Sequence, residues 1–518
     1  MTEGKHHTRI GAFVLETLTT GMYRNPLDAL REYVQNAFDS IRAAERQDVI
    51  KAHAGRINIS ISTENRMLCL RDNGIGVAAS DVAARLVNIG MSGKNLESDA
   101  GFRGIGRLAG IAYCDSLVFK TQHHEEKKVS TVTFDARALR EAMSPKNREV
   151  KELGEVVDTY VAVTTEPARK KDHFLEVSMN GINSNGDAFL APKDVRLYLE
   201  QVAPLPMDTQ SFHLAREFYD WVKKAGVALP EVNVVIDSDG TSYELFKPYK
   251  KLTYSTAQGN HKVHVRGLHF FPQNITSDSP FWLWYAETNC PGVIRDDAVA
   301  GLRLRKSNIG IGLSERMTDV FRMASESYAR FNRYFIGEVH VQDSSVIPNA
   351  HRDDFEESPE WIDIRDQLVL FAKERSREAY SHSEGRNADV EKLVTNADRQ
   401  LEEAAKKQHT GLASRTEQDK LSTSIEKHIT KMTAAEKADR SEEERRRLDK
   451  KRKELQKAKE RIANETKFIG QTLKSSLDKK QRKIISDILG LLYDVLDGQN
   501  FETAKAAILK KYQAPEKD

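Results

Sequence analysis

The fold is decided by a ten-residue stretch near the N-terminus, Leu30-Arg31-Glu32-Tyr33-Val34-Gln35-Asn36-Ala37-Phe38-Asp39. It lies within residues 25–46, which predict a helix with Asn25 as cap, Pro26 in the first turn and apolar residues at helical spacing. Glu32, Asn36 and Asp39 stand at i, i+4 and i+7, so they share one face. Two carboxylates and an amide suit a magnesium–nucleotide site, because Mg²⁺ prefers oxygen ligands and a glutamate can deprotonate water. The same spacing is also typical of a solvated polar face.

Glycine-containing segments follow this helix. Asp72, Gly74 and Gly76 come after an apolar strand, where backbone can pass close to a ligand and Asp72 can accept a hydrogen bond from an adenine amino group. Asp-Asn-Gly is also a strong turn sequence. A second glycine cluster, residues 101–106, runs into an apolar helix whose first amides would bind phosphate. The chain contains no P-loop, since neither Gly-Lys pair is followed by Ser or Thr, and its glycines do not fit a Rossmann unit.

In order and spacing, these segments resemble the motifs of the GHKL (Bergerat-fold) ATPase superfamily, which includes the Hsp90 chaperones, type II topoisomerases, MutL and MORC proteins. Residues 32–39 are similar to the N box E-x-x-x-N-x-x-D, residues 72–76 to the D-x-G-x-G box and residues 101–106 to the second glycine box. Residues 89–94 resemble the start of the ATP lid, with Lys94 near phosphate as in MORC-like members. Asp158-Thr159-Tyr160-Val161 resembles the late strand whose threonine lies behind the adenine. The chain is identified as an Hsp90-like or MORC-like member.

The resemblance implies a role for each matching residue. Glu32 would be the general base, Arg31 would position Glu32, and Asn36 would hold Mg²⁺. The other matching residues would bind the nucleotide: Asp39, Asp72, Gly74, Gly76, Ser92, Lys94, Gly101, Gly104, Gly106 and Thr159. ATP and Mg²⁺ are the implied cofactors, and hydrolysis of ATP to ADP and phosphate is the implied activity.

A weaker resemblance lies further along the chain. Residues 336–353 resemble the stretch of the Hsp90 middle domain that ends in a Leu-Asn-x-Ser-Arg-Glu-like loop. In that family the loop arginine reaches the γ-phosphate, which makes Arg352 a candidate. A lysine does this in the topoisomerase and MutL relatives, which makes Lys306 the alternative. Arg352 could instead form a surface ion pair with Asp353 or Asp354, and Lys306 could be a solvated lysine on a strand edge.

The 518 residues predict two or three domains of overall α/β (α+β) class. We expect the following divisions: a Bergerat α/β sandwich at 8–170, a second α/β domain of Hsp90-middle or S5-like type at 171–360, a long-helix or coiled-coil arm at 361–483, and a helical dimerisation segment at 484–518. Strands are expected at 56–62, 67–71, 129–134, 159–165, 262–271 and 335–341.

The C-terminal third is rich in charged residues. Leu448, Leu455, Ile462 and Ile469 recur every seven residues, and a hairpin of long helices broken near Gly411 would fit. A basic run, residues 445–453, follows three glutamates, so it predicts either a solvated helix or a nucleic-acid contact. The last segment carries an apolar stripe suited to a constitutive dimer or to local packing: Ile484, Ile485, Ile488, Leu489, Leu492, Val495 and Leu496.

Composition narrows the remaining choices. The formal net charge of +2 gives no overall bias towards nucleic acid. Cys69, Cys114 and Cys290 make no zinc or disulfide pattern and predict buried or half-buried thiols. Neither a signal peptide nor a long apolar span is evident, which predicts a cytoplasmic protein that does not enter a membrane.

The sequence therefore predicts an ATP-driven conformational machine that closes as a homodimer held through its C-terminal helices and acts, like a chaperone, on a macromolecular partner. Whether that partner is protein or DNA stays open. The alternatives are a MORC-like ATP-gated DNA clamp and a scaffold that binds ATP without hydrolysing it. A histidine kinase is not expected, because that class places a phospho-accepting histidine on a dimerisation helix before the ATP domain. Here the ATP domain would begin near residue 10, and its N box carries the hydrolytic Glu32.

Overall fold

The computed structural model describes residues 10–19, 25–90, 104, 106–144, 152–257, 262–289, 292–387, 390–437, 442–468 and 477–512. Its contacts divide the chain into two units. The first contains residues up to 374 except 289–291, and the second contains the remainder. In the described part of the chain, no helix combines the length and the apolar character that crossing a membrane requires.

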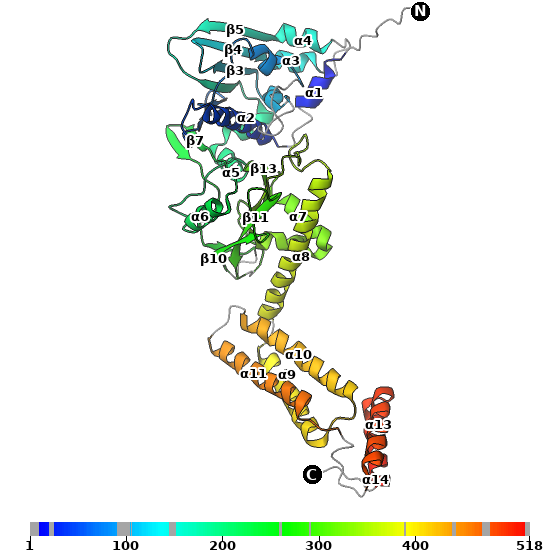
Figure 1. Ribbon diagram of the computed structural model, residues 1–518. Coiled ribbons are helices and arrows are strands. Elements are labelled where there is room, and N and C mark those ends of the chain that lie inside the picture. Colours follow the sequence, from blue (N-terminus) through cyan, green and yellow to red (C-terminus); the bar gives the residue numbers. More distant parts are fainter. Residues whose placement is uncertain are drawn as a thin grey trace, which may run out of the picture. The chain divides into compact units, whose positions relative to one another are not determined.

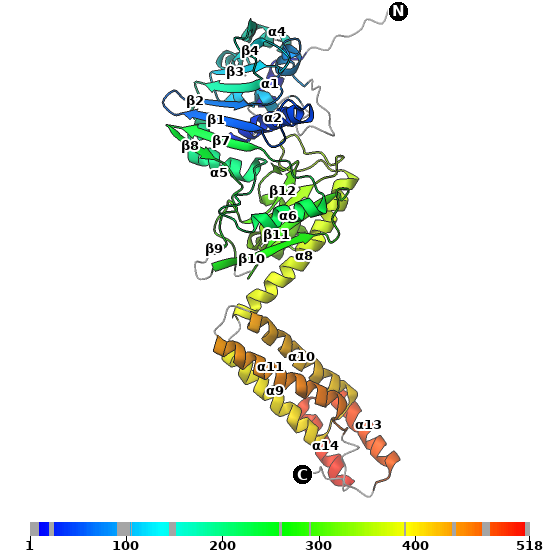
Figure 2. The ribbon, with the colours of Figure 1, turned by 60° about the vertical axis from the view of Figure 1, so that its left-hand side comes forward.

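The first unit begins with an eight-stranded sheet in the order β5-β4-β3-β6-β2-β1-β7-β8 (Figures 1 and 2). All neighbouring strands are antiparallel except β1 and β7. The strands are β1 (Arg56–Ser62), β2 (Met67–Asp72), β3 (Ser116–Gln122), β4 (Lys128–Asp135), β5 (Val161–Pro167), β6 (Phe174–Asn180), β7 (Asn233–Ser238) and β8 (Thr241–Glu244).

The helix predicted from the opening stretch is α2 (Leu27–Arg46). Its start matches the expected capping, because the backbone N–H of Leu27 donates to the Asn25 side chain. Its apolar face is buried in one hydrophobic core with residues of the sheet. The other elements of that core include α1 (Phe13–Thr19), the 3₁₀ helix η2 (Gly106–Ala112), α3 (Ala136–Ala142) and α4 (Leu153–Tyr160). The sheet therefore supports α2, and α2 carries the candidate residues.

Two expectations for this region are corrected. The predicted boundary at residue 170 is wrong for the sheet, because β6 lies between β3 and β2, and β7 extends the sheet beyond β1. Val177 and Met179 of β6 are buried in the same core as α2, so that strand completes the core instead of starting a new one. Residues 158–160 end helix α4, and the strand begins only at Val161. Thr159 is exposed, and its hydroxyl donates to the Glu155 carbonyl, so it does not lie behind a nucleotide pocket.

A six-stranded sheet follows in the order β13-β12-β14-β11-β10-β9. Its strands are β9 (Thr253–Ser255), β10 (Lys262–Phe271), β11 (Phe281–Thr288), β12 (Gly301–Lys306), β13 (Ile309–Ile311) and β14 (Ile336–Val341). Helix α5 (Pro192–Val202) precedes it, and α6 (Ala215–Ala225) packs Phe218 against Trp282 and Trp284 of β11. Helix α7 (Glu315–Ala324) follows β13.

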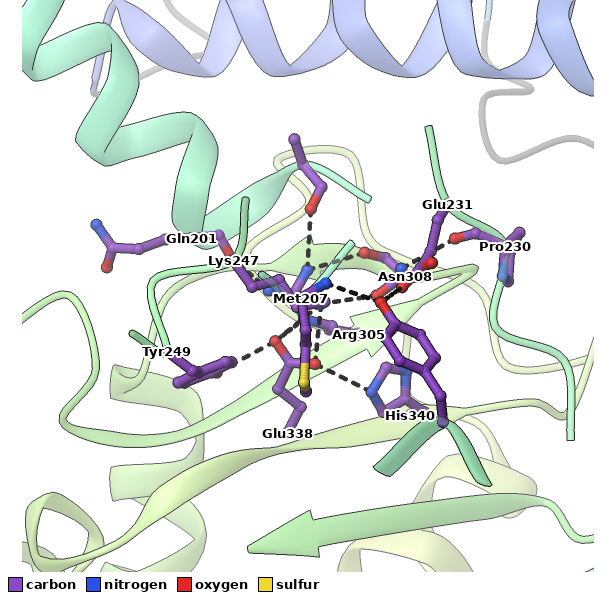
Figure 3. Close-up of polar contacts among 12 residues, drawn as sticks. Gln201, Met207, Pro230, Glu231, Lys247, Tyr249, Arg305, Asn308, Glu338 and His340 are labelled. Carbon is purple, nitrogen blue, oxygen red and sulfur yellow. Dashed lines mark hydrogen bonds and ion pairs between the residues drawn. The ribbon is translucent and has the colours of Figure 1, made fainter. Parts of the chain in front are cut away.

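The core of this second sheet contains a buried ionic cluster (Figure 3). The Glu338 carboxylate on β14 lies 2.6 Å from Arg305 Nε and 2.9 Å from Lys247 Nζ. Tyr249 donates its hydroxyl to the same carboxylate, and His340 Nε2 lies 3.2 Å from it. All three charged side chains are fully buried. Because its partners surround it, Glu338 keeps a pKa well below its ordinary value despite its burial.

The second unit is helical. Helices α9 (Val390–Thr410), α10 (Arg415–Lys437) and α11 (Glu442–Asn464) run side by side in both views, and Gly411 adopts a positive φ at the predicted break (Figures 1 and 2). Leu448, Leu455 and Ile462 are fully buried between these helices. The heptad stripe is thus a seam of a local three-helix bundle, whereas Ile469 lies outside the described residues.

Helix α8 (Pro359–Asn387) contains the division between the units, and α13 (Lys479–Val495) and α14 (Gly498–Lys511) form a pair near the C-terminus. Ile485 and Leu489 of α13 are buried in a small core with residues of α14. A second side of α13 is exposed at Ile484, Ile488, Leu491 and Val495, which we call the α13 face. The predicted apolar stripe therefore splits into a packed side and an open side.

Candidate active site

The polar face of α2 turns inward. Glu32 and Asp39 are each only 7% exposed, and Asn36 between them is half-buried. A solvated polar face is therefore excluded for the two carboxylates. Tyr33 fixes this helix against η2, because its hydroxyl donates to the Arg107 carbonyl and accepts the Gly110 N–H.

Two further elements meet α2 at Glu32. Gly106, the first residue of η2, lies so close that a Cβ there would overlap the Glu32 carboxylate, so only glycine fits without a shift. From the second domain, Arg352 places its Nε 2.9 Å from Glu32 Oε1, and both residues are buried. The structure thus brings together one residue from each of three sequence segments that were predicted separately.

The loop that carries Arg352 is tightly held. A backbone bridge between Pro348 and Phe355 closes it, and the Asn349 side chain donates to Asp353 inside it. Gly312, just after β13, donates its N–H to the Arg352 carbonyl at 2.9 Å. Arg352 itself has a φ of 54°, a conformation that costs a non-glycine residue energy and persists only when its surroundings impose it.

The other two basic candidates, Arg31 and Lys306, are directed to backbone carbonyls. Arg31 was expected to position Glu32, but its guanidinium is directed to the loop, where it donates to the carbonyls of His351 and Arg352 at 3.0 and 3.4 Å. Lys306, at the end of β12, donates to the Asp343 carbonyl, and burial lowers its pKa to about 8. No contact between Lys306 and Glu32 is found in the described part of the chain, so the geometry favours Arg352.

Asp72 lies at the end of β2 and is 2% exposed. Its Oδ1 accepts the backbone N–H groups of Gly74 at 2.7 Å and of Leu175 at 3.4 Å. Burial nevertheless raises its pKa to about 7, because desolvation outweighs these two hydrogen bonds, the charge of Arg71 and the Ser40 hydroxyl. The second oxygen, Oδ2, is buried without a well-directed hydrogen bond from any described residue.

The glycines that follow Asp72 bring this loop close to its neighbours. Gly74 packs on Ser40 of α2, and Ile75 donates its N–H to the Ser40 carbonyl. Gly76 has a φ of 74°, and a Cβ there would overlap the Gln122 carbonyl of β3. Asp72 is therefore held beside the same helix that carries Glu32, Asn36 and Asp39.

The described residues include only part of the predicted phosphate-binding segments. Ser92, Lys94 and Gly101 lie outside the described residues. The Gly104 carbonyl accepts a hydrogen bond from Arg107 at 2.6 Å, and the same guanidinium donates to the carbonyls of Leu86 and Asn88. The sequence analysis did not predict this role of Arg107. An arginine directly after a glycine box and inside an apolar segment could have indicated a buried residue that holds the glycine loop.

His173 was missed as well. Its Nδ1 lies 2.8 Å from the Gly74 carbonyl, in the segment that leads into β6. Strand β2, which ends at Asp72, pairs with β1 and β6, and not with the segment around Thr159. The alternation of Leu175, Val177 and Met179 with polar residues was the available signal for strand β6.

The basic run of α11 is largely engaged within the second unit. Its cations pair with carboxylates of α9, α10 and α11 as follows: Arg446 with Glu442, Arg447 with Glu391, Lys451 with Asp398, Arg452 with Glu436 and Lys453 with Asp449. These pairs favour the solvated helix over the nucleic-acid contact, since phosphates would have to displace existing partners.

Comparisons with known proteins agree with the geometry of the first domain. Residues 25–159 match a family described as "Histidine kinase-, DNA gyrase B-, and HSP90-like ATPase". The chain is also 28% identical over 127 residues to the chaperone protein HtpG of Fusobacterium nucleatum subsp. nucleatum. That match covers 21% of this chain and 21% of the relative, so it spans about a fifth of either protein. Residues 25–159, which contain Glu32, Asp72 and Gly106, are therefore similar to ATPases of the GHKL type, in agreement with the resemblance of their motifs.

Proposed function

We propose that the protein binds and hydrolyses Mg-ATP beside α2 and uses the cycle to drive closure of a homodimer that acts on a macromolecular partner. The observation that carries this proposal is the meeting of Glu32 with Gly106 and Arg352. Such a constellation supplies a base, a close backbone and a cation at one point, which are the parts that phosphoryl transfer to water requires.

Nucleotide recognition would begin at Asp72. Its buried Oδ2 can accept one more hydrogen bond, which fits the amino group of adenine. Asn36 and Asp39 lie on the same helix face as Glu32 and offer oxygen atoms, which fits a magnesium ion that takes its other ligands from phosphates and water. When bound, this ion would neutralise charge on the phosphates.

In the hydrolytic step, Glu32 would take the proton of the attacking water. Gly106 leaves room for the phosphate-binding backbone directly beside that carboxylate. Arg352 would contact the γ-phosphate and offset the charge that develops there. Because its guanidinium already lies 2.9 Å from Glu32, a small movement can transfer it from the carboxylate to a phosphate oxygen.

The test is phosphate release by the full chain and by Glu32→Ala. We expect the variant to be about 10²–10⁴-fold slower, the usual contribution of a general base. Glu45→Ala, in the last turn of the same helix, is the matched control and should hydrolyse ATP like the wild type. Equal rates for wild type and Glu32→Ala would overturn the mechanism. ATP binding without any phosphate release would identify a scaffold instead.

The homodimer is proposed to form through the α13 face. Its four residues follow helical spacing and are 57%, 41%, 68% and 80% exposed, while Ile485 and Leu489 behind them are buried. A stripe of this kind is self-complementary, so a second copy can cover it by two-fold symmetry. Light scattering should give a dimer for the wild type and for Leu370→Asp, a matched exposed leucine on α8, and a monomer for Leu491→Asp.

A further inference from the structure

Arg31 occupies an unexpected position for a residue that precedes the proposed base. It is 3% exposed and donates to two consecutive carbonyls of the loop that carries Arg352. Its Nη1 also lies 3.8 Å from Asp28 Oδ1, one turn earlier on α2. Because the acceptors are backbone carbonyls, these two hydrogen bonds fix the loop itself.

The Asp28 carboxylate has a second partner from outside α2. Tyr198 of α5 donates its hydroxyl to Asp28 Oδ1 at 2.6 Å, the same oxygen that faces Arg31. Tyr198 is 7% exposed. A hydrogen bond to a charged group in a buried setting is stronger and more directional than a neutral one, so this contact ties α5 to α2.

Helix α5 is in turn fixed to the second sheet. Arg305 of the buried ionic cluster donates to the carbonyls of Gln201 and Ala203, at and just beyond the α5 C-terminus (Figure 3). Glu338 holds Arg305 from the other side. After the turn at Asn308 the chain enters β13 and reaches Gly312, which donates to the Arg352 carbonyl. The contacts thus form a closed circuit from α2 through α5 and the second sheet back to the Arg352 loop.

We propose that Tyr198, Asp28 and Arg31 form a positioning relay that sets Arg352 relative to Glu32 according to the position of α5. The relay rests on the proposed ATPase function and adds to it a path from the second sheet to the γ-phosphate. It acts through the Arg352 loop, so it affects steps that involve the γ-phosphate and leaves the binding of ADP unchanged. The three residues act through the Arg352 loop, so we treat them as positioning residues.

A purely structural role for these contacts makes a different prediction. If Tyr198 only fastens α5 to α2, its hydroxyl contributes to stability, and the rate of hydrolysis by the folded protein does not depend on it. Tyr219→Phe gives the matched control for this possibility. Tyr219 is also a buried tyrosine whose hydroxyl contacts a carboxylate, that of Glu231, but it lies outside the relay.

The experiment compares wild type, Tyr198→Phe, Arg31→Lys and Tyr219→Phe by phosphate release, ADP affinity and thermal midpoint. Loss of one charge-assisted hydrogen bond should lower kcat of Tyr198→Phe about three- to tenfold. Arg31→Lys should lower it further, since a lysine cannot hold two carbonyls in one plane. ADP affinity should stay within about twofold, and the thermal midpoint of Tyr198→Phe should match that of Tyr219→Phe.

A double-variant cycle decides whether the effect passes through Arg352. In an Arg352→Ala background, Tyr198→Phe should have no further effect on kcat, because the relay then has nothing to position. The relay is overturned if the Tyr198→Phe effect is the same in both backgrounds, or if Tyr198→Phe and Tyr219→Phe hydrolyse ATP equally while Glu32→Ala is inactive. Equal rates for wild type and Glu32→Ala would instead remove the proposed function and the relay together.

Discussion

Asp72 in the first domain and Glu338 in the second are both almost completely buried acids, yet their pKa values shift in opposite directions. Burial raises the pKa of Asp72 to about 7, whereas Arg305 and Lys247 hold the pKa of Glu338 well below its ordinary value in spite of the same burial. The difference lies in the donors. Two backbone N–H groups serve one oxygen of Asp72, while two cations, a tyrosine and a histidine surround Glu338.

The contrast separates an acid that holds the fold together from an acid that is suited to a ligand. A carboxylate saturated with donors has no capacity left for binding, and it rigidifies the elements that supply those donors. A buried oxygen without a well-directed donor is costly in the folded protein, and a ligand that donates to it recovers part of that cost. The hydrogen bonding of Asp72 is therefore typical of a ligand-binding acid, whereas that of Glu338 is typical of an acid that stabilises the fold.

The largest expected effect is on stability. Glu338→Gln should lower the free energy of unfolding by about 3–5 kcal/mol, because it leaves Arg305 and Lys247 buried without their counter-charge. Asp72→Asn should be neutral or stabilising at pH 8, where the buried charge is removed. Urea unfolding of the two variants beside the wild type measures both. A loss below about 1 kcal/mol in Glu338→Gln would break the distinction between the two acids.

The next prediction concerns pH. A pKa of about 7 at Asp72 against an ordinary value of 3.8 means that the folded protein keeps this proton between about pH 4 and pH 7 while the unfolded chain has lost it. The contribution of Asp72 is thus fully present below pH 4 and is lost as the pH rises to 7, by at most about 4 kcal/mol. Unfolding curves at several pH values should show a flatter profile for Asp72→Asn than for wild type in that window, and parallel profiles would contradict the shift.

Nucleotide affinity should respond to the same substitution. If ionised Asp72 accepts the adenine amino group, Asp72→Asn should weaken ATP and ADP binding alike at pH 8, by about 10–100-fold, the range for a hydrogen bond to a charged group. Calorimetric titration measures both constants. Asp187→Asn, an exposed aspartate paired with Arg66, is the control and should bind like the wild type. Unchanged affinity in Asp72→Asn would show that the buried oxygen serves another purpose.

The two acids also differ in how far the sequence predicts them. Asp72, Glu32 and Gly106 belong to local motifs, in which spacing along one helix or around one turn defines a shared face. Glu338 carries no such signal, because Lys247, Arg305 and Glu338 come from three separate segments. In β12 the alternation of leucine and arginine suggests a half-exposed strand, but Arg303 and Arg305 are both buried. Only the packed structure supplies their partners.

The same limit explains the errors at the edges of the first domain. The predicted end at residue 170 followed the last recognised motif, whereas strand pairing across more than a hundred residues adds β6 and β7 to that sheet. Long-range pairing leaves no local pattern beyond alternation, which β6 shares with any other strand. Thr159 was placed on a strand for a similar reason, because a short helix and a strand meet at Val161 without a glycine or proline to mark the boundary.

The smallest expected effect is that of replacing Lys306, and it decides which of the two basic candidates left open by the sequence contacts the γ-phosphate. Arg352 contacts Glu32, while Lys306 donates to the Asp343 carbonyl, and burial lowers its pKa to about 8. Lys306→Met should therefore keep kcat within about twofold of wild type, whereas Arg352→Met should lower it by about 10²–10³, the effect of removing a charge-stabilising donor from a transition state. Phosphate-release assays on samples that are equally well folded measure the kcat of both variants. A Lys306→Met variant as slow as Arg352→Met would shift the γ-phosphate contact to β12. The pairing of Glu32 with Arg352 would then be a structural ion pair like that of Glu338 with Arg305, and the contrast between the two regions would have to rest on Asp72 alone.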